Sequence, residues 1–157
     1  MTREETIVKH LTDKFPYLEG KYQITRQRRI FVTATRDQHL EILAFLKDND
    51  FNFLCTITGL DIADEYQIMY NLATMDGVML NLKVNIPKSD PVISAIIGIY
   101  EGSLFYEREL VDMFGIEARG LPAGRNYPLP EGWPKDQHPL RKDWKPEMLN
   151  QKQEVGQ

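Results

Sequence analysis

The sequence predicts an α+β fold, with one mainly antiparallel mixed sheet and helices on a face of that sheet. Two observations favour this class: segments with helical spacing alternate with short β-branched runs, and those runs are grouped around turn residues. Helices that alternate with such groups cover a face of the sheet that the strands form. A third observation divides the chain, because six of its nine prolines lie beyond Glu117. We therefore predict an α+β domain over residues 1–116 and an extended, proline-rich docking arm over residues 117–157.

The first part of the predicted domain contains a helix, a hairpin and a second helix. Thr2 precedes acidic residues and apolar positions at helical spacing, and Pro16 follows, so the first helix should end near Lys14. Residues 21–34 contain two alternating apolar runs around a polar stretch, which is the pattern of a β-hairpin. Between residues 36 and 48, apolar side chains recur at intervals of three and four, and this predicts the second helix.

Three further strands follow the second helix. Their segments are rich in β-branched and aromatic residues, and the last two flank the turn signal Asp76-Gly77. The three strands are predicted over residues 53–61, 66–74 and 78–86.

Two helices complete the predicted domain. Asp90 and Pro91 have the identities of a helix cap and a first helical residue, and the apolar residues up to Ile97 predict a short helix. The segment 104–114 predicts a further amphipathic helix, and Gly115 stands where a C-terminal glycine is expected.

Glu107 is a charge on the apolar side of that last helix. On a helical wheel it falls among apolar side chains, where a lone carboxylate is costly to bury. We therefore expect a cationic partner from the arm, either Arg125 or Arg141. A general acid or base with a raised pKa is the alternative interpretation, and we favour the structural ion pair.

The opposite side of the same helix carries Arg108, Glu109 and Asp112. Arg108 and Asp112 are four residues apart and can pair, although such a pair on a solvated face contributes only tenths of a kcal/mol, on the order of 0.3. Spacing alone therefore gives these three residues no function.

Composition excludes several classes of function. The net charge is −4 and the basic residues are dispersed, so neither nucleic acid nor a direct membrane surface is an expected partner. No apolar run approaches the roughly 20 residues of a membrane span. Cys55 is the only cysteine, which excludes an internal disulfide and a thiolate-based iron–sulfur or zinc site within the chain. The histidines have no recognisable ligand spacing, so no metal site is expected.

A set of motifs runs from the last helix into the arm. Glu-Arg-Glu-Leu-Val-Asp-Met-Phe-Gly-Ile occupies residues 107–116, Leu-Pro-Glu-Gly-Trp occupies 129–133, and His-Pro-Leu-Arg-Lys-Asp-Trp occupies 138–144. With Gly120, Pro122 and Arg125 between them, these motifs resemble the thirty-kilodalton subunit of NADH dehydrogenase, complex I. In that family the helix and the arm organise contacts with the neighbouring catalytic subunit.

The resemblance implies a subunit-interface or structural role for the motif residues, and no catalytic, cofactor-binding or metal-binding residue. Trp133 and Trp144 also suit an interface as aromatic anchors. A competing interpretation is that the arm packs back on its own domain. The motif residues are Glu107, Arg108, Glu109, Asp112, Arg125, Trp133, His138, Pro139, Arg141, Lys142, Asp143 and Trp144.

Residues 121–126 depart from the respiratory pattern, and residues 124–138 resemble more closely the equivalent subunit of energy-converting group 4 nickel–iron hydrogenases. That resemblance implies a cofactor-free subunit on the cytoplasmic face of the cell membrane, held there through its complex. It would brace a hydrogenase-like large subunit and iron–sulfur subunits, connected indirectly to membrane ion-pump subunits. Iron–sulfur clusters and a nickel–iron site are then expected in those partners, where ferredoxin electrons reduce protons.

Three alternatives remain at this point. The chain could be the equivalent subunit of respiratory complex I, or an independent assembly or binding module. It could also be a free enzyme that uses Glu107 or His138, although no nucleophile motif accompanies either residue.

Overall fold

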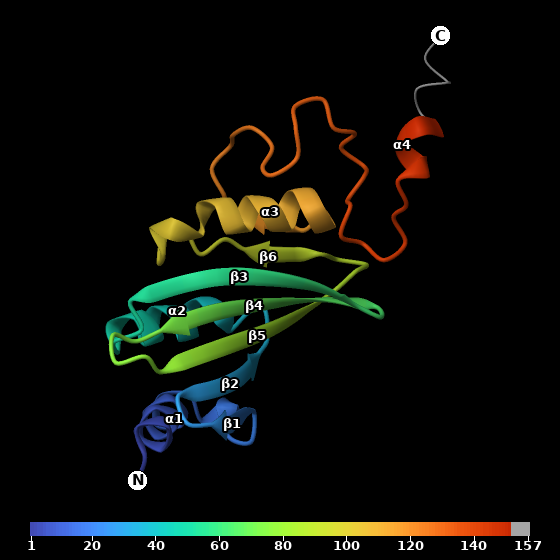
Figure 1. Cartoon of the computed structure of the whole chain (residues 1–157). Coiled ribbons are helices and arrows are strands. Elements are labelled where there is room, and N and C mark those ends of the chain that lie inside the picture. The colour runs from blue at the N-terminus through green and yellow to red at the C-terminus, as the bar shows by residue number, and fades with distance from the viewer. Residues whose placement is uncertain (152–157) are drawn as a thin grey trace.

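Five strands form the central sheet in the order β1-β2-β5-β4-β3 in the computed structural model, which describes residues 1–151 (Figure 1). Neighbouring strands are antiparallel except β2 and β5, which are parallel. This mixed, mainly antiparallel sheet with its helices confirms the predicted α+β class. The strands are β1 Tyr22–Arg26, β2 Arg29–Ala34, β3 Phe53–Ile62, β4 Glu65–Ala73 and β5 Met79–Pro87.

Helices α2 and α3 lie against the sheet, with α2 behind β4 and α3 beside β3, whereas α4 lies away from the sheet in Figure 1. At the start of α1, the Thr2 hydroxyl accepts the Glu5 N–H at 3.2 Å and the Glu5 carboxylate accepts the Thr2 N–H at 2.7 Å. This reciprocal cap explains why the helix begins where the sequence predicts. The helices are α1 Arg3–Lys14, η1 Pro16–Leu18, α2 His39–Asp48, η2 Glu101–Ser103, α3 Leu104–Phe114 and α4 Glu147–Gln151.

The core lies between one face of the sheet and helices α1, α2 and α3. Alternate residues of β2, β4 and β5 point into it, as the period of two along a strand requires. From α2, three apolar residues on one side of the helix are fully buried against that face. The central core residues are Ile30, Val32, Ile68, Tyr70, Leu80, Leu82, Val84, Ile42, Leu43 and Leu46.

The helix predicted over residues 91–97 is wrong, because Val92–Ser94 forms strand β6. The Asp90 carboxylate does not cap a helix but pairs with Arg36 at 2.7 Å. Strand β6 lies parallel to β7, Glu117–Arg119, and the Glu117 N–H donates to the Pro91 carbonyl at 2.8 Å. A partner strand that lies far along the chain therefore overrides a local helix signal.

Strand β7 comes from the beginning of the predicted arm. Beyond it, the chain runs from Gly120 to α4 with turns and bends, and it passes over α3 in Figure 1. The division into a domain at 1–116 and an arm at 117–157 stays a prediction, and residues 152–157 of that arm lie outside the described residues.

Candidate functional site at the end of helix α3

Helix α3 ends at Gly115, as the sequence predicts. Gly115 has φ of +71° and ψ of +30°, a left-handed conformation that glycine adopts without steric cost. Its N–H donates to the Val111 carbonyl at 2.9 Å. The three carbonyls that follow Val111 in the helix have no partner within α3, as is usual for the last turn of a helix.

The arm supplies the missing donors for these three carbonyls. His138 Nδ1 lies 2.8 Å from the Asp112 carbonyl oxygen, and Arg141 Nε donates to the Phe114 carbonyl at 2.6 Å. The Leu140 N–H donates to the Met113 carbonyl at 3.0 Å. Because a carbonyl can only accept, the His138 contact assigns the ring proton to Nδ1. The His-Pro-Leu-Arg motif therefore caps α3, and the cation of Arg141 lies at the negative end of the helix dipole.

Two glycines allow this close packing. A Cβ on Gly115 would lie 2.6 Å from His138 Nε2 and would also clash with the guanidinium of Arg141. On the other side of α3, a Cβ on Gly59 of β3 would lie 2.5 Å from a ring carbon of Phe114. Helix α3 is thus held between β3 and the arm, with glycine at each close approach.

Glu107 is buried, as the sequence indicates, but the prediction that a cation pairs with it is wrong. The carboxylate accepts the Ile96 N–H at 2.6 Å and the Ser103 hydroxyl at 2.8 Å. Arg141 instead donates to the Phe114 carbonyl at the end of α3. Arg125 is exposed, with no hydrogen bond or ion pair among residues 1–151. Burial raises the pKa of Glu107, and the two donors oppose that rise. Glu107 therefore fixes the chain between β6 and α3.

The arm also covers the outward side of α3. The Asp112 carboxylate accepts the Leu129 N–H at 3.3 Å, and the Arg108 guanidinium occupies the space where Gly124 has no side chain. The suggested Arg108–Asp112 ion pair does not form among the described residues. These two motif residues contact the chain's own arm, which supports the interpretation that the arm packs on its own domain.

The two tryptophans of the arm are joined through Gln137, which is buried. The Trp133 indole N–H donates to the Gln137 carbonyl at 2.8 Å, and the Trp144 indole N–H donates to its side-chain oxygen at 3.0 Å. The Gln137 amide donates in turn to the Met148 carbonyl at 2.9 Å. Both indole N–H groups are therefore used within the arm, and only their ring surfaces remain for other contacts.

A surface remains around this junction that the chain itself does not cover. Leu140 is 46% exposed, and the side chains of Lys142 and Asp143 are exposed beside it. Two other motif residues, Pro139 and Glu109, are half-buried. We call Leu140, Lys142 and Asp143 the exposed junction surface.

Sequence reasoning missed two residues that organise the site. Asp61 at the end of β3 accepts the Lys142 N–H at 3.0 Å, across 81 positions of the chain. Gln137 connects the tryptophans, as described above. Neither residue has a local pattern that could reveal its partners, because both contacts depend on how the arm folds back.

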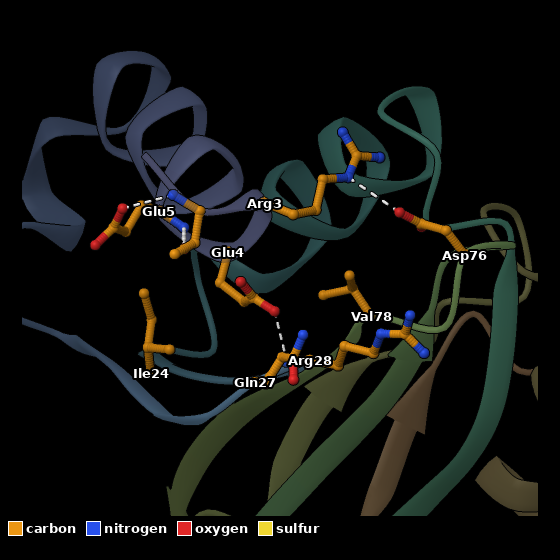
Figure 2. Close-up of a pocket in the computed structure, with 9 residues that line it drawn as sticks. Arg3, Glu4, Glu5, Ile24, Gln27, Arg28, Asp76 and Val78 are labelled. Carbon is orange, nitrogen blue, oxygen red and sulfur yellow. Dashed lines mark hydrogen bonds and ion pairs between the residues drawn. The ribbon is translucent and has the colours of Figure 1, made fainter.

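A surface cavity lies at the other end of the molecule, between the start of α1 and the β1–β2 turn. Figure 2 shows this cavity, with a volume of about 570 Å³. Its carboxylates already have partners: Asp76 pairs with Arg3 at 3.3 Å, the Glu4 carboxylate accepts the Arg28 N–H at 2.5 Å, and the Glu5 carboxylate accepts the Thr2 N–H at 2.7 Å. These contacts leave no converging set of free polar groups that would recognise a ligand.

The described part of the chain contains neither a metal cluster nor a membrane-spanning helix. Within residues 1–151, no three His, Cys, Asp or Glu side chains gather in a way that could hold a metal ion. No helix within the same residues is long and apolar enough to cross a membrane.

Known proteins resemble this chain over most of its length. A family model described as respiratory-chain NADH dehydrogenase, 30 Kd subunit, matches residues 32–148. One subunit of the F(420)H(2) dehydrogenase of Methanosarcina mazei is 32% identical over 143 residues, which cover 88% of this chain and 90% of that protein. Membrane-bound hydrogenase subunit beta of Pyrococcus furiosus is 28% identical, with coverage of 92% and 88%.

A longer relative and a solved structure show the same resemblance. NADH-quinone oxidoreductase subunit 5 of Thermus thermophilus is 31% identical over 128 residues, and the matched part spans only 61% of that protein. A chain in the structure of the membrane-bound sulfane sulfur reductase, an archaeal respiratory membrane complex, superposes with a TM-score of 0.85 at 24% identity. That alignment covers 97% of this chain and 91% of the other, and at this identity it shows a shared fold.

Proposed function

Because this chain belongs to the family of the 30 Kd subunit of respiratory-chain NADH dehydrogenase, we propose that it is a non-catalytic subunit of a membrane-bound oxidoreductase complex. Two relatives that this chain covers almost completely are named as subunits of a dehydrogenase and of a membrane-bound hydrogenase. In this proposal the chain carries no cofactor, and the iron–sulfur clusters and any nickel–iron site belong to other subunits.

The observation that carries the proposal is the junction between α3 and the arm. His138, Leu140 and Arg141 use their donors to cap α3, so this segment has a fixed conformation within the chain. A fixed segment that leaves an apolar side chain exposed between polar ones has the character of an interface, where a central apolar contact is surrounded by a polar rim. The exposed junction surface would then contact the neighbouring large subunit.

The proposed contribution is positional. The sheet and α3 would form a rigid support, and the arm would hold the large subunit and iron–sulfur subunits at a fixed separation. The subunit would lie peripherally on the cytoplasmic face of the membrane, connected to ion-pump subunits only through its partners. The motif residues His138 and Arg141 would thus serve two purposes, since they cap α3 and also orient the exposed junction surface.

The specific reaction of the complex is a narrower proposal. Energy-converting hydrogenase is our first candidate, supported by the full-length similarity to the membrane-bound hydrogenase subunit beta at 28% identity. The alternative is a dehydrogenase complex, which the higher identity of 32% to the F(420)H(2) dehydrogenase subunit favours.

An affinity tag on this chain in its native host tests both levels of the proposal. Membranes are solubilised in mild detergent, the co-purifying subunits are identified, and the preparation is assayed for nickel, hydrogen evolution and quinone reduction. Large and iron–sulfur subunits together with nickel and hydrogen evolution support the hydrogenase. The same subunits with quinone reduction and no nickel support the dehydrogenase, whereas recovery of the chain alone contradicts the subunit proposal.

A further inference from the structure

We propose that Asp61 is a positioning residue for docking, which holds the exposed junction surface in its binding conformation before a partner arrives. This role rests on the proposed function, because it concerns how the arm is presented to the neighbouring subunit. Asp61 lies outside the arm and outside the motifs that identify the family by sequence.

The Asp61 carboxylate is buried at the end of β3, with its side chain only 4% exposed. One oxygen accepts the main-chain N–H of Lys142 at 3.0 Å. The other lies 2.6 Å from Nζ of Lys88, the residue that follows β5, and forms an ion pair with it. Burial raises the pKa of Asp61, but Lys88 and the Lys142 N–H lower it by more, so the net shift is downward. Asp61 is therefore an anion at neutral pH.

The groups around Asp61 connect three separate parts of the chain. Lys88 Nζ lies 5.4 Å from the ring centre of Tyr66 on β4, and the Arg141 guanidinium carbon lies 5.8 Å from the same ring. Tyr66 is buried, so the two cations flank an aromatic surface that excludes water from this side. Residues at the ends of β3, β4 and β5 thus form one contact site for residues 141 and 142 of the arm.

The contact of Asp61 with the arm is to main chain rather than side chain. It fixes the backbone of Lys142 while the Lys142 side chain stays exposed, together with Leu140 and Asp143. Since the side chain of the preceding residue, Arg141, donates through Nε to the Phe114 carbonyl, two adjacent residues of the arm are anchored. With both anchors in place, the exposed junction surface has one orientation, and binding requires little further ordering of the arm.

Two variants of Asp61 in the full-length tagged chain test this role. Asp61→Leu removes both contacts, whereas Asp61→Asn keeps an oxygen that can accept the Lys142 N–H but loses the ion pair with Lys88. The control is a change at Ile42, fully buried on α2, to valine or alanine, chosen to match the unfolding free energy of Asp61→Leu. Hydrogen exchange at the Lys142 amide and recovery of partner subunits from native membranes are measured for each.

We expect the Lys142 amide of Asp61→Leu to exchange about tenfold faster or more, as for the loss of one hydrogen bond to a charged group. Recovery of partner subunits should fall in Asp61→Leu, fall less in Asp61→Asn, and stay normal in the Ile42 control of equal stability. A merely structural role would reduce recovery equally in Asp61→Leu and in that control, and this result would overturn the inference alone. Failure of the wild-type chain to recover any subunit would instead overturn the proposed function, and the role of Asp61 with it.

Discussion

Gly115 holds the C-terminus of α3 in a left-handed conformation directly beneath two side chains of the arm. Replacement of Gly115 by alanine adds a methyl group 2.6 Å from His138 Nε2 and against the Arg141 guanidinium. Room for that methyl group requires the His138 ring and the Arg141 guanidinium to shift, which weakens their hydrogen bonds to α3. Gly115→Ala therefore weakens the cap that the arm places on α3 by adding a single methyl group.

The expected cost has two parts. Alanine at φ of +71° costs about 1 kcal/mol relative to glycine. Loss of the hydrogen bonds from His138 and Arg141 to the helix carbonyls costs about 1 kcal/mol each. Gly115→Ala should thus lower the free energy of unfolding by about 3 kcal/mol. Gly120 is the matched control, because its φ is +89° and no atom lies within 4 Å of an added Cβ. Gly120→Ala should cost only the backbone part, about 1 kcal/mol.

Urea unfolding followed by circular dichroism measures both losses, and fluorescence reports on the arm because Trp133 and Trp144 are the only tryptophans. We expect the fluorescence of Gly115→Ala to change before urea is added, and that of Gly120→Ala to match the wild type. Equal costs for the two variants, with unchanged fluorescence, would refute the packing of the arm against α3.

Three further changes test separate parts of the structure. Gly59→Ala should cost about 1–3 kcal/mol in urea unfolding, because the new Cβ would lie 2.5 Å from the Phe114 ring and force α3 to shift; a neutral result would contradict that contact. The pKa of Glu107 is raised on folding, so the wild type loses stability as pH rises from the unfolded-state pKa through the folded one. Glu107→Gln lacks this loss, and its stability relative to the wild type should therefore increase across that window and then level off; a constant difference from about pH 4 to about pH 8 would count against it. Arg125→Ala should change the unfolding free energy by less than about 0.5 kcal/mol and yet reduce recovery of partner subunits, and unchanged recovery would contradict the interface role that the family resemblance implies for Arg125.

For elements with strong local sequence signals, the prediction and the structure agree. The cap at Thr2 sets the start of α1, the turn at Asp76-Gly77 separates β4 from β5, and Gly115 ends α3. In each case the signal and the element it specifies lie within a few residues of each other. Local propensity and the folded state then favour the same structure.

The differences arise where distant segments meet. Strand β6 depends on β7, which joins it from beyond α3, and the carboxylate that would have capped a helix there pairs with Arg36. Glu107 is buried as predicted, but its partners are a main-chain N–H and a serine hydroxyl, which periodicity cannot identify. The contact between Asp61 and Lys142 is likewise set by the path of the arm. The family could be identified from motif residues, whereas their contacts within the chain required the structure.

Site-specific crosslinking in the native complex tests the central claim most directly. In one variant a photoreactive residue replaces Leu140, which belongs to the exposed junction surface and is 46% exposed. In a second variant it replaces Met75, which lies in the β4–β5 turn and is 80% exposed. After irradiation of membranes, the crosslinked partners are identified by mass spectrometry. The proposed function predicts that position 140 crosslinks to the large subunit of an oxidoreductase complex and that position 75 does not. A crosslink from position 75 alone, or none from position 140 in an intact complex, would contradict docking through the α3–arm junction.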